Sequence, residues 1–209
     1  MLGSVVNTNV ANISGSIASD FEFSHEIYGE QFYNFFIDVP RLSNTCDRLP
    51  VMVSERLLDG ININIESRVA ITGQIRSYNR VNSDGKGHLL LSIFCKDIKN
   101  STEEDKIKNP NDIFLDGYLC KKPIYRTTPF GREICDILLA VNRMYNKSDY
   151  IPCIAWGRNA RFCERLSVGT HVRIWGRFQS REYQKRLDDE NVITRIAYEV
   201  SISKMEKLD

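Results

Sequence analysis

Apolar and polar residues alternate along most of this chain, in short runs separated by turn residues. A period of two is typical of strands that bury one face. In the second half of the chain the alternation predicts five strands, over residues 113–119, 133–142, 149–156, 171–179 and 194–203. Between the third and fourth strands the spacing predicts one helix over 159–166, buried through Ala160, Phe162, Cys163 and Leu166.

The first half of the chain repeats the second. Gly15 lies 102 residues before Gly117, and the residues around the two glycines match. The same offset, or one of 103 further along, relates three more pairs, which are Asp47 and Asp149, Pro50 and Pro152, and Gly73 and Gly176. We therefore expect two copies of one module, as an N-terminal domain over 1–99, a linker over 100–111 and a C-terminal domain over 112–209.

Five strands with one helix between the third and the fourth describe an OB fold, a partly open barrel. Each copy is also expected to begin with a hairpin, whose turn falls over 24–30 in the first copy and 127–132 in the second. The sequence thus predicts an all-β protein of two tandem five-stranded OB barrels, each with at most one short helix between strands 3 and 4. Folds of this kind bind oligonucleotides on one sheet face and its flanking loops.

Composition places the chain among ordinary globular proteins, with 42% hydrophobic and 26% charged residues among 209. No apolar run approaches the roughly 18 residues of a membrane helix, and no secretory leader opens the sequence. We expect a cytoplasmic protein with no membrane contact. The six cysteines include no Cys-x-x-Cys pair and the histidines number three, so we predict free thiols, no metal site and no cofactor.

The net charge of +1 hides a strong segregation along the chain. Residues 1–112 carry 11 basic and 15 acidic side chains, a net −4, and residues 187–209 carry 3 and 6, a net −3. Residues 113–186 carry 14 and 6, a net +8. Eleven of these fourteen basic residues follow residue 130, interleaved with aromatic residues. A solvated basic face would explain the charge alone, but the interleaving favours nucleic acid over a membrane surface.

The predicted strand over 149–156 carries the strongest candidate chemistry. Tyr150, Ile154 and Trp156 leave the same face of an extended strand, and Arg158 follows on the same side. Flat rings beside a guanidinium suit stacked bases and phosphates. An ordinary core strand explains Tyr150 and Trp156 too, and for this strand taken alone the core explanation is favoured. The surrounding charge and motifs shift the balance toward a binding face.

Three stretches of the second copy, residues 138–143, 148–158 and 169–183, resemble the core of bacterial single-stranded DNA-binding proteins in order and spacing. The resemblance covers nearly all of residues 113–205. The chain as a whole is similar to tandem-OB members of the Firmicute type. The first copy resembles the family mainly through the internal repeat.

This resemblance implies a sequence-independent site for single-stranded DNA. The base-stacking aromatics of the family fall on Tyr150, Trp156 and Tyr183, and stacking contributes roughly 1 to 3 kcal/mol per base. The basic groove of the family falls on Arg143, Arg158, Arg177 and Arg181, to which Lys185 is added. Trp175 remains open between a stacking position and a core position.

The first copy departs from this pattern. Arg48 stands where the second copy has Tyr150, and Ser54 stands where it has Trp156. Tyr78 alone falls near a stacking position. Four aromatic residues crowd the second predicted strand, where core or interface is the commoner use, and these are Phe32, Tyr33, Phe35 and Phe36. We expect a structural or pairing role for the first copy.

Three classes of function compete. An enzyme is the weakest, because the sequence has no Walker loop, no Gly-x-Ser-x-Gly and no His-Glu-x-x-His, and the adjacent acids Asp188-Asp189-Glu190 suit a solvated hairpin tip better than a metal site. An OB-fold protein-interaction adaptor or a primosomal accessory protein is the alternative. Charge and aromatic placement favour DNA for the second copy. The family resemblance implies a nucleoid-associated protein that protects single-stranded DNA in replication, recombination or repair.

Two questions of partnership stay open. Single-stranded RNA remains a second candidate ligand, because stacking and phosphate contacts do not read the 2′-hydroxyl. Two fused modules fit a monomer with two OB folds as well as a homodimer with four. The sequence ends directly after the fifth predicted strand, without the acidic tail of the family, so we do not expect tail-mediated recruitment of replication proteins.

Overall fold

The computed structural model describes residues 7–81, 85, 87–102, 109–186 and 192–208, and for residues 81, 185, 186 and 192 it describes the backbone alone. The triplet Asp188-Asp189-Glu190 and the middle of the predicted linker lie outside these residues. Within the described ranges, no helix combines the length and the apolar character needed to cross a membrane.

Within the described residues, each half of the chain forms six strands and one short helical segment. The first half forms β1 (Asn9–Ile17), β2 (Glu22–Ile27), β3 (Glu30–Pro40), β4 (Cys46–Ser54), the 3₁₀ turn η1 (Glu55–Leu57), β5 (Arg68–Val81) and β6 (Gly87–Asn100). The second half forms β7 (Asn111–Leu119), β8 (Ile124–Thr127), β9 (Glu133–Arg143), β10 (Lys147–Trp156), α1 (Arg158–Glu164), β11 (His171–Arg186) and β12 (Val192–Lys207).

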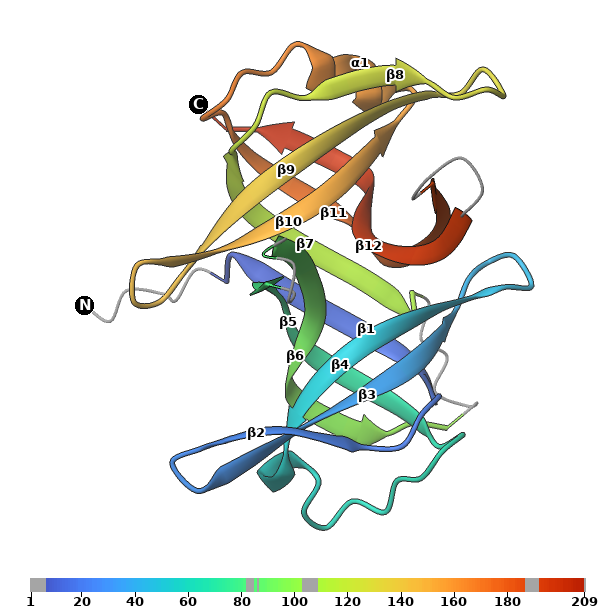
Figure 1. Ribbon diagram of the computed structural model, residues 1–209, viewed down its shortest axis with the longest axis vertical. Coiled ribbons are helices and arrows are strands. Elements are labelled where there is room, and N and C mark those ends of the chain that lie inside the picture. The colour runs from blue at the N-terminus through green and yellow to red at the C-terminus, as the bar shows by residue number, and fades with distance from the viewer. Residues whose placement is uncertain (1–6, 82–84, 86, 103–108, 187–191, 209) are drawn as a thin grey trace.

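Each set of strands closes into a barrel, and the two barrels lie one above the other along the long axis (Figure 1). In the first barrel β3 pairs with β4, β4 pairs in parallel with β6, β6 pairs with β5, and β5 pairs with β1, which returns to β3. Strands β7 and β9–β12 repeat this circuit. This connectivity confirms the predicted all-β pair of OB barrels.

The strands differ from the predicted ones in number and length. β2 and β8 are additional strands, which pair with β3 and β9 across the expected hairpins. The first hairpin turns tightly through Tyr28 and Gly29, both at positive φ. β11 and β12 stay paired out to Arg186 and Val192, because this ribbon continues past the barrel, where no core imposes the alternation from which strands were predicted.

The helix is shorter than predicted, and this changes what it buries. Ala160 and Cys163 are buried, whereas Phe162, expected on the same side, is 40% exposed. Seven residues make about two turns, so the buried side holds only one such pair. In the first copy the same connection is η1, where the side chain of Ser54 accepts a hydrogen bond from the backbone N–H of Arg56.

Aliphatic side chains on the inward faces of the strands fill both barrels. Ile37, Val51 and Ile93 are fully buried in the first barrel, as are Leu139 and Ile151 in the second. All six cysteines are free, and four of them are buried. The core therefore follows from the period-two pattern alone.

Two of the repeat's glycines lie where a strand crosses its neighbour closely. A Cβ on Gly15 would lie 2.2 Å from the carbonyl oxygen of Asp38, and one on Gly117 would lie 2.5 Å from that of Ala140. No side chain fits at such a distance. The repeated glycine therefore marks the point where the first strand of each barrel packs against the third strand of that half, β3 or β9.

The antiparallel pairing of β1 with β7 joins the two barrels into one 12-stranded sheet. Ala11 faces Ile113, which is its own equivalent at the 102-residue offset. Asn9 is equivalent to Asn111, and Ile13 to Leu115. Asn9 pairs with Leu115 and Ile13 pairs with Asn111, so these two flanking pairs are equivalent to each other. The pairing is therefore the same when seen from either copy, and a pseudo-two-fold axis passes between Ala11 and Ile113.

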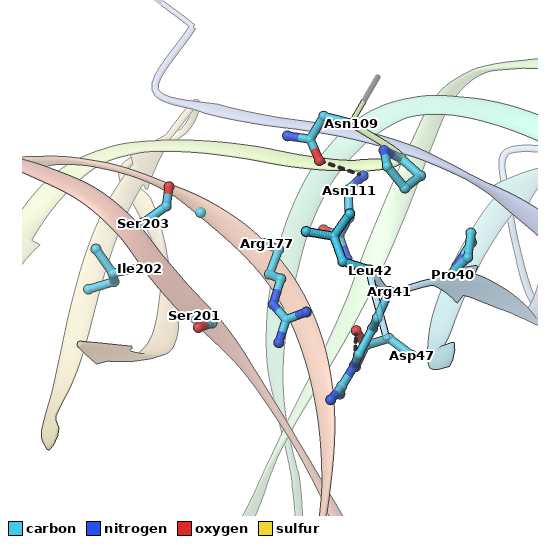
Figure 2. Close-up of a pocket in the computed structure, with 12 residues that line it drawn as sticks. Pro40, Arg41, Leu42, Asp47, Asn109, Asn111, Arg177, Ser201, Ile202 and Ser203 are labelled. Carbon is cyan, nitrogen blue, oxygen red and sulfur yellow. Dashed lines mark hydrogen bonds and ion pairs between the residues drawn. The ribbon is translucent and has the colours of Figure 1, made fainter. Parts of the chain in front are cut away.

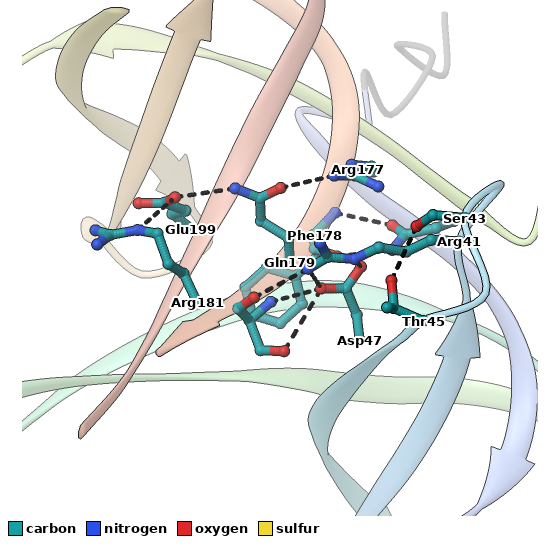
Figure 3. A network of polar contacts seen from close by, with 11 residues as sticks. Arg41, Ser43, Thr45, Asp47, Arg177, Phe178, Gln179, Arg181 and Glu199 are labelled. Atoms are coloured by element: carbon teal, nitrogen blue, oxygen red, sulfur yellow. Dashed lines mark hydrogen bonds and ion pairs between the residues drawn. The ribbon is translucent and has the colours of Figure 1, made fainter. Parts of the chain in front are cut away.

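Two buried aspartates fasten the barrels on either side of this axis. Asp47, on β4, accepts a hydrogen bond from the backbone N–H of Ser180 on β11 at 2.9 Å and is paired with Arg41 (Figure 3). Nη2 of Arg41 also donates to the carbonyl oxygen of Ser180 at 3.0 Å. We call this contact the Asp47 seam.

The Asp149 seam is its equivalent on the other side. Asp149 is 0% exposed and accepts hydrogen bonds from the backbone N–H of Ser77 at 2.9 Å and from Nη1 of Arg76 at 2.8 Å. Nη1 of Arg143 lies 3.6 Å from the same carboxylate. The backbone N–H of Tyr150 donates to Oγ of Ser77 at 2.7 Å. The start of β10 is thus held by the first copy.

Replacement of Gly117 by alanine should destabilise the fold by about 1 to 3 kcal/mol, because the added methyl group has no room beside Ala140. Urea denaturation measures the loss. Gly87→Ala is the matched control, since nothing lies within 4 Å of a Cβ at that position. Equal stability of the two variants would contradict the close crossing.

Replacement of Asp149 by alanine should cost about 3 kcal/mol of unfolding free energy, the low end for breaking a buried pair, because Arg76 and Arg143 still reach water. Asp136→Ala serves as control: its pair with Arg126 is 2.7 Å long but exposed, and such a pair contributes at most about 1 kcal/mol. Urea denaturation of both variants checks the difference, and a loss no larger than the control's would show that the seam does not hold the barrels.

Candidate nucleic-acid interface

The outer face of β10 presents two of the three predicted stacking residues. Tyr150 is 44% exposed and Trp156 is 37% exposed, while Ile151 and Cys153 point into the barrel. Ile154, predicted on the same face, is only 2% exposed, with sheet neighbours on both sides. The face therefore consists of two separate rings. Six residues of strand set them about 20 Å apart.

Trp156 lies beside the hairpin between β8 and β9. Its Nε1 donates to Oγ of Ser201 at 3.2 Å, which fixes the ring against β12. A hollow of about 530 Å³ is lined by Trp156, Thr128, Phe130 and Arg132. Phe130 is 92% exposed and was not predicted as a site residue. The sequence feature that could have identified Phe130 is an aromatic residue inside a predicted turn.

Tyr183 and Arg181 lie on the β11–β12 ribbon. The guanidinium carbon of Arg181 is 6.0 Å from the ring centroid of Tyr183, within range of a cation–π interaction. Both residues line a groove of about 720 Å³. We call it the axial groove, because each of the two copies related by the pseudo-two-fold axis contributes one of its walls. Tyr78 and Arg80 from β5 belong to the opposite wall.

The axial groove is basic and partly apolar. Its exposed apolar rim contains Phe36, Tyr78, Leu89, Tyr183 and Ile196. Its charged lining contains Arg80, Arg181, Arg195 and Glu199. The carboxylate is already engaged, since it accepts hydrogen bonds from Nε2 of Gln179 at 2.9 Å and Nε of Arg181 at 3.3 Å (Figure 3). Three arginines therefore outweigh one paired acid.

The structure separates the other predicted cations. Arg143 belongs to the Asp149 seam, and Nη2 of Arg177 donates to Oε1 of Gln179 at 3.0 Å. Arg158 begins α1, is exposed, and has no ion-pair partner among the described residues. The side chain of Lys185 lies outside the described part of the chain.

Trp175 is half-buried by contacts with its own barrel. Its ring centroid lies 5.2 Å from that of Phe114, and Nζ of Lys204 lies 4.4 Å from it. The residue is absent from the buried core but its ring already has a protein neighbour and a cation. Trp175 is thus less exposed than Trp156.

Two hollows at the seams, equivalent under the pseudo-two-fold axis, differ strongly in charge. The hollow at the Asp47 seam, about 460 Å³, contains Arg41 and Arg177 (Figure 2). The hollow at the Asp149 seam, about 660 Å³, contains four cations, which are Arg76, Lys96, Arg143 and Lys147. Burial and the nearby charge of Arg76 lower the pKa of Lys96, as expected for crowded cations.

The tip of the β9–β10 hairpin closes the second of these hollows. Tyr145 is 86% exposed there and Met144 is 76% exposed. Tyr145 and Asn146 both have positive φ, which turns the tip sharply. Tyr145 is one of the aromatic residues interleaved with the basic ones after residue 130, but it was not predicted as a site residue. Its placement beside four cations makes it a further candidate.

Comparison with known proteins gives a family match for the second copy. Residues 110–208 match the model of the single-strand binding protein family. Single-stranded DNA-binding protein 1 of Staphylococcus aureus (strain COL) is 37% identical over 83 residues, which are 36% of this chain and 50% of that protein. The chain thus spans about half the length of this curated relative.

A second relative is covered more fully. Single-stranded DNA-binding protein B of Bacillus subtilis (strain 168) is 32% identical over 84 residues, which are 35% of this chain and 72% of that protein. A crystal structure of a deletion mutant of the single-stranded DNA binding protein from Thermus aquaticus matches with a TM-score of 0.70 and 16% identity, over 96% of this chain and 94% of that one. That likeness shows the same fold in both copies. On these sequence matches, the chain belongs to the single-strand binding protein family.

Proposed function

We propose that the chain binds single-stranded DNA without sequence preference, stacking bases on exposed rings and neutralising phosphates with nearby cations. The observation that carries the proposal is the outer face of β10, where Tyr150 and Trp156 stay exposed while alternate residues fill the barrel. A ring exposed on a rigid sheet can stack on any base, because every base has a π face. The family and the names of the relatives point to the same ligand.

In this proposal the strand follows β10 and then enters the axial groove. One base covers Trp156, beside Phe130 and Arg132, and another covers Tyr150. Because about 20 Å separates the two rings, each takes a different base. The cation of Arg158 is available to a phosphate near Trp156, since no described acid engages it. Binding of this kind protects a single strand in replication, recombination or repair.

In the axial groove, Tyr183 and Arg181 receive the strand from the second copy. Tyr78 and Arg80 of the first copy form the facing wall. A strand there contacts both barrels at once. The first copy would then share in binding, besides the structural or pairing role expected from its sequence.

Binding to oligo-dT should exceed binding to a duplex of the same length by orders of magnitude, because bases in a duplex are already stacked on each other. The logarithm of the affinity should fall linearly with that of the salt concentration, by roughly 0.7 per phosphate neutralised on a single strand. Fluorescence anisotropy of labelled oligonucleotides over a salt series measures both. Equal affinity for the duplex would rule out stacking, and a parallel series with oligo-rU shows whether RNA is also a ligand.

Replacement of Trp156 by alanine should weaken oligo-dT binding by roughly 1 to 3 kcal/mol, the contribution of one stacked base. The melting temperature should fall less than for a core aromatic, whose truncation costs about 3 to 5 kcal/mol. Tyr28→Ala is the control, because Tyr28 is fully exposed at the β2–β3 hairpin tip of the other barrel. A large fall in melting temperature with unchanged affinity per folded molecule would assign Trp156 to the core instead.

A further inference from the structure

We propose that the first barrel carries a second base-stacking site for single-stranded nucleic acid, built from side chains on different strands from those of β10. The site is a row of three rings, His25, Phe32 and Phe94, which we call the aromatic ladder. This inference rests on the proposed function, since it assumes the same class of ligand, but it assigns binding to a surface on which the family's stacking positions are missing.

The aromatic ladder crosses the outer face of the first barrel. The ring of His25 on β2 stacks on that of Phe32 on β3, with centroids 5.0 Å apart and an interplanar angle of 7°. Phe32 in turn lies 6.1 Å from Phe94 on β6, at 30°. All three residues are half-buried, and none belongs to the buried core. Their rings therefore form a continuous surface that water still reaches.

The ladder flanks the position that is equivalent to Trp156 in the other copy. Its rings lie on the strands on either side of that position instead of on the central strand. In the second barrel Trp156 faces Ile134 on β9 and is hydrogen-bonded to Ser201 on β12. The equivalent of Ile134 is Phe32, which faces Ser54.

The neighbour on the other side of the central strand also differs between the two copies. Met52 faces Phe94 in the first barrel, as Ile154 faces Ser201 in the second, so Phe94 is the equivalent of Ser201. The second copy has a large ring on its central strand between small or aliphatic neighbours. The first copy has a serine there between two large rings. The aromatic surface has been kept, although the positions that carry it have changed.

Cations border the ladder at the end nearest the pseudo-two-fold axis. The guanidinium carbon of Arg76 lies 6.0 Å from the ring centroid of Phe94. Lys96 follows Phe94 by two residues on β6, and both cations line the hollow at the Asp149 seam together with Lys147 and Tyr145. The ladder thus runs toward a hollow lined by four cations. That charge favours a polyanion over a neutral or acidic peptide as the occupant.

The far end of the ladder is less favourable to phosphate. Glu30 accepts a hydrogen bond from Ser54 and lies 3.4 Å from Arg56. Glu55 accepts a hydrogen bond from the backbone N–H of Gln31 at 2.9 Å. Residues 1–112 also carry a net charge of −4. We therefore place the phosphates at the Lys96 end, and expect this site to bind more weakly than that of the second barrel.

A single reporter can test the ladder in the full-length chain. Both tryptophans, Trp156 and Trp175, belong to the second copy, so a variant with Trp156→Phe, Trp175→Phe and Phe94→Trp carries its only indole in the ladder. Saturation with a long dT oligonucleotide should quench its emission, as stacking on a base does. Anisotropy of the labelled oligonucleotide, measured on the same samples, reports binding anywhere on the chain.

The outcomes separate the two proposals. Quenching on binding supports the ladder. Saturated binding with unchanged emission overturns the ladder and leaves the proposed function standing. If the natural chain itself fails to bind, both proposals are overturned. A fall in melting temperature large enough to unfold the reporter would move the test to the second variant below.

The second variant, Phe32→Leu with Phe94→Leu, removes two flat rings while keeping apolar volume. On a dT strand long enough to cover both barrels, it should occupy fewer nucleotides per molecule than the natural chain, and its affinity should fall roughly 5- to 150-fold. Phe23→Leu is the matched control, since Phe23 is 60% exposed on β2 but lies outside the ladder. If this variant covers as many nucleotides per molecule as the control and binds with the same affinity, the proposal is overturned, whatever the reporter shows.

Discussion

The antiparallel pairing of β1 with β7 is the constraint on which the rest of the molecule depends. Backbone hydrogen bonds across this pair fix how the barrels meet, because a shift by one residue would turn every side chain of the strand to the other face. With Ala11 set against Ile113, Asp47 reaches the backbone of Ser180, and Asp149 reaches that of Ser77. The axial groove and both seam hollows follow from the same alignment.

The two copies show how one fold can keep a surface while its sequence drifts. Inward positions in both barrels remain apolar and mostly aliphatic, because the core tolerates little change in volume. Outer positions are freer, and aromatic area has moved from the central strand to its neighbours, as at Ser54 between Phe32 and Phe94. Equivalence of position is therefore a poor guide to equivalence of surface, and the first copy cannot be judged by Arg48 and Ser54 alone.

Much of the fold could be predicted from the sequence, because period-two alternation and the repeated glycines report packing that is local or symmetric. The pairing of β1 with β7 could not be predicted, since the sequence of neither strand indicates which strand it pairs with. For the site, parity predicted the exposed face of Tyr150 and Trp156, but it also placed Ile154 there, which its sheet neighbours bury. Phe130, Tyr145 and the ladder are further candidates that parity within one strand could not indicate, because each is grouped with residues from outside its own strand or turn.

The unequal hollows at the two seams give the molecule a direction. A symmetric pair of identical barrels presents the same surface to a linear polymer laid on it either way. Here one seam holds Arg41 and Arg177, and the other holds four cations with Tyr145 at its mouth. A chemically directional strand crossing from one barrel to the other meets these charges in one order or in the reverse, so its two 5′-to-3′ orientations differ in energy. The two copies therefore present an asymmetric surface to such a strand.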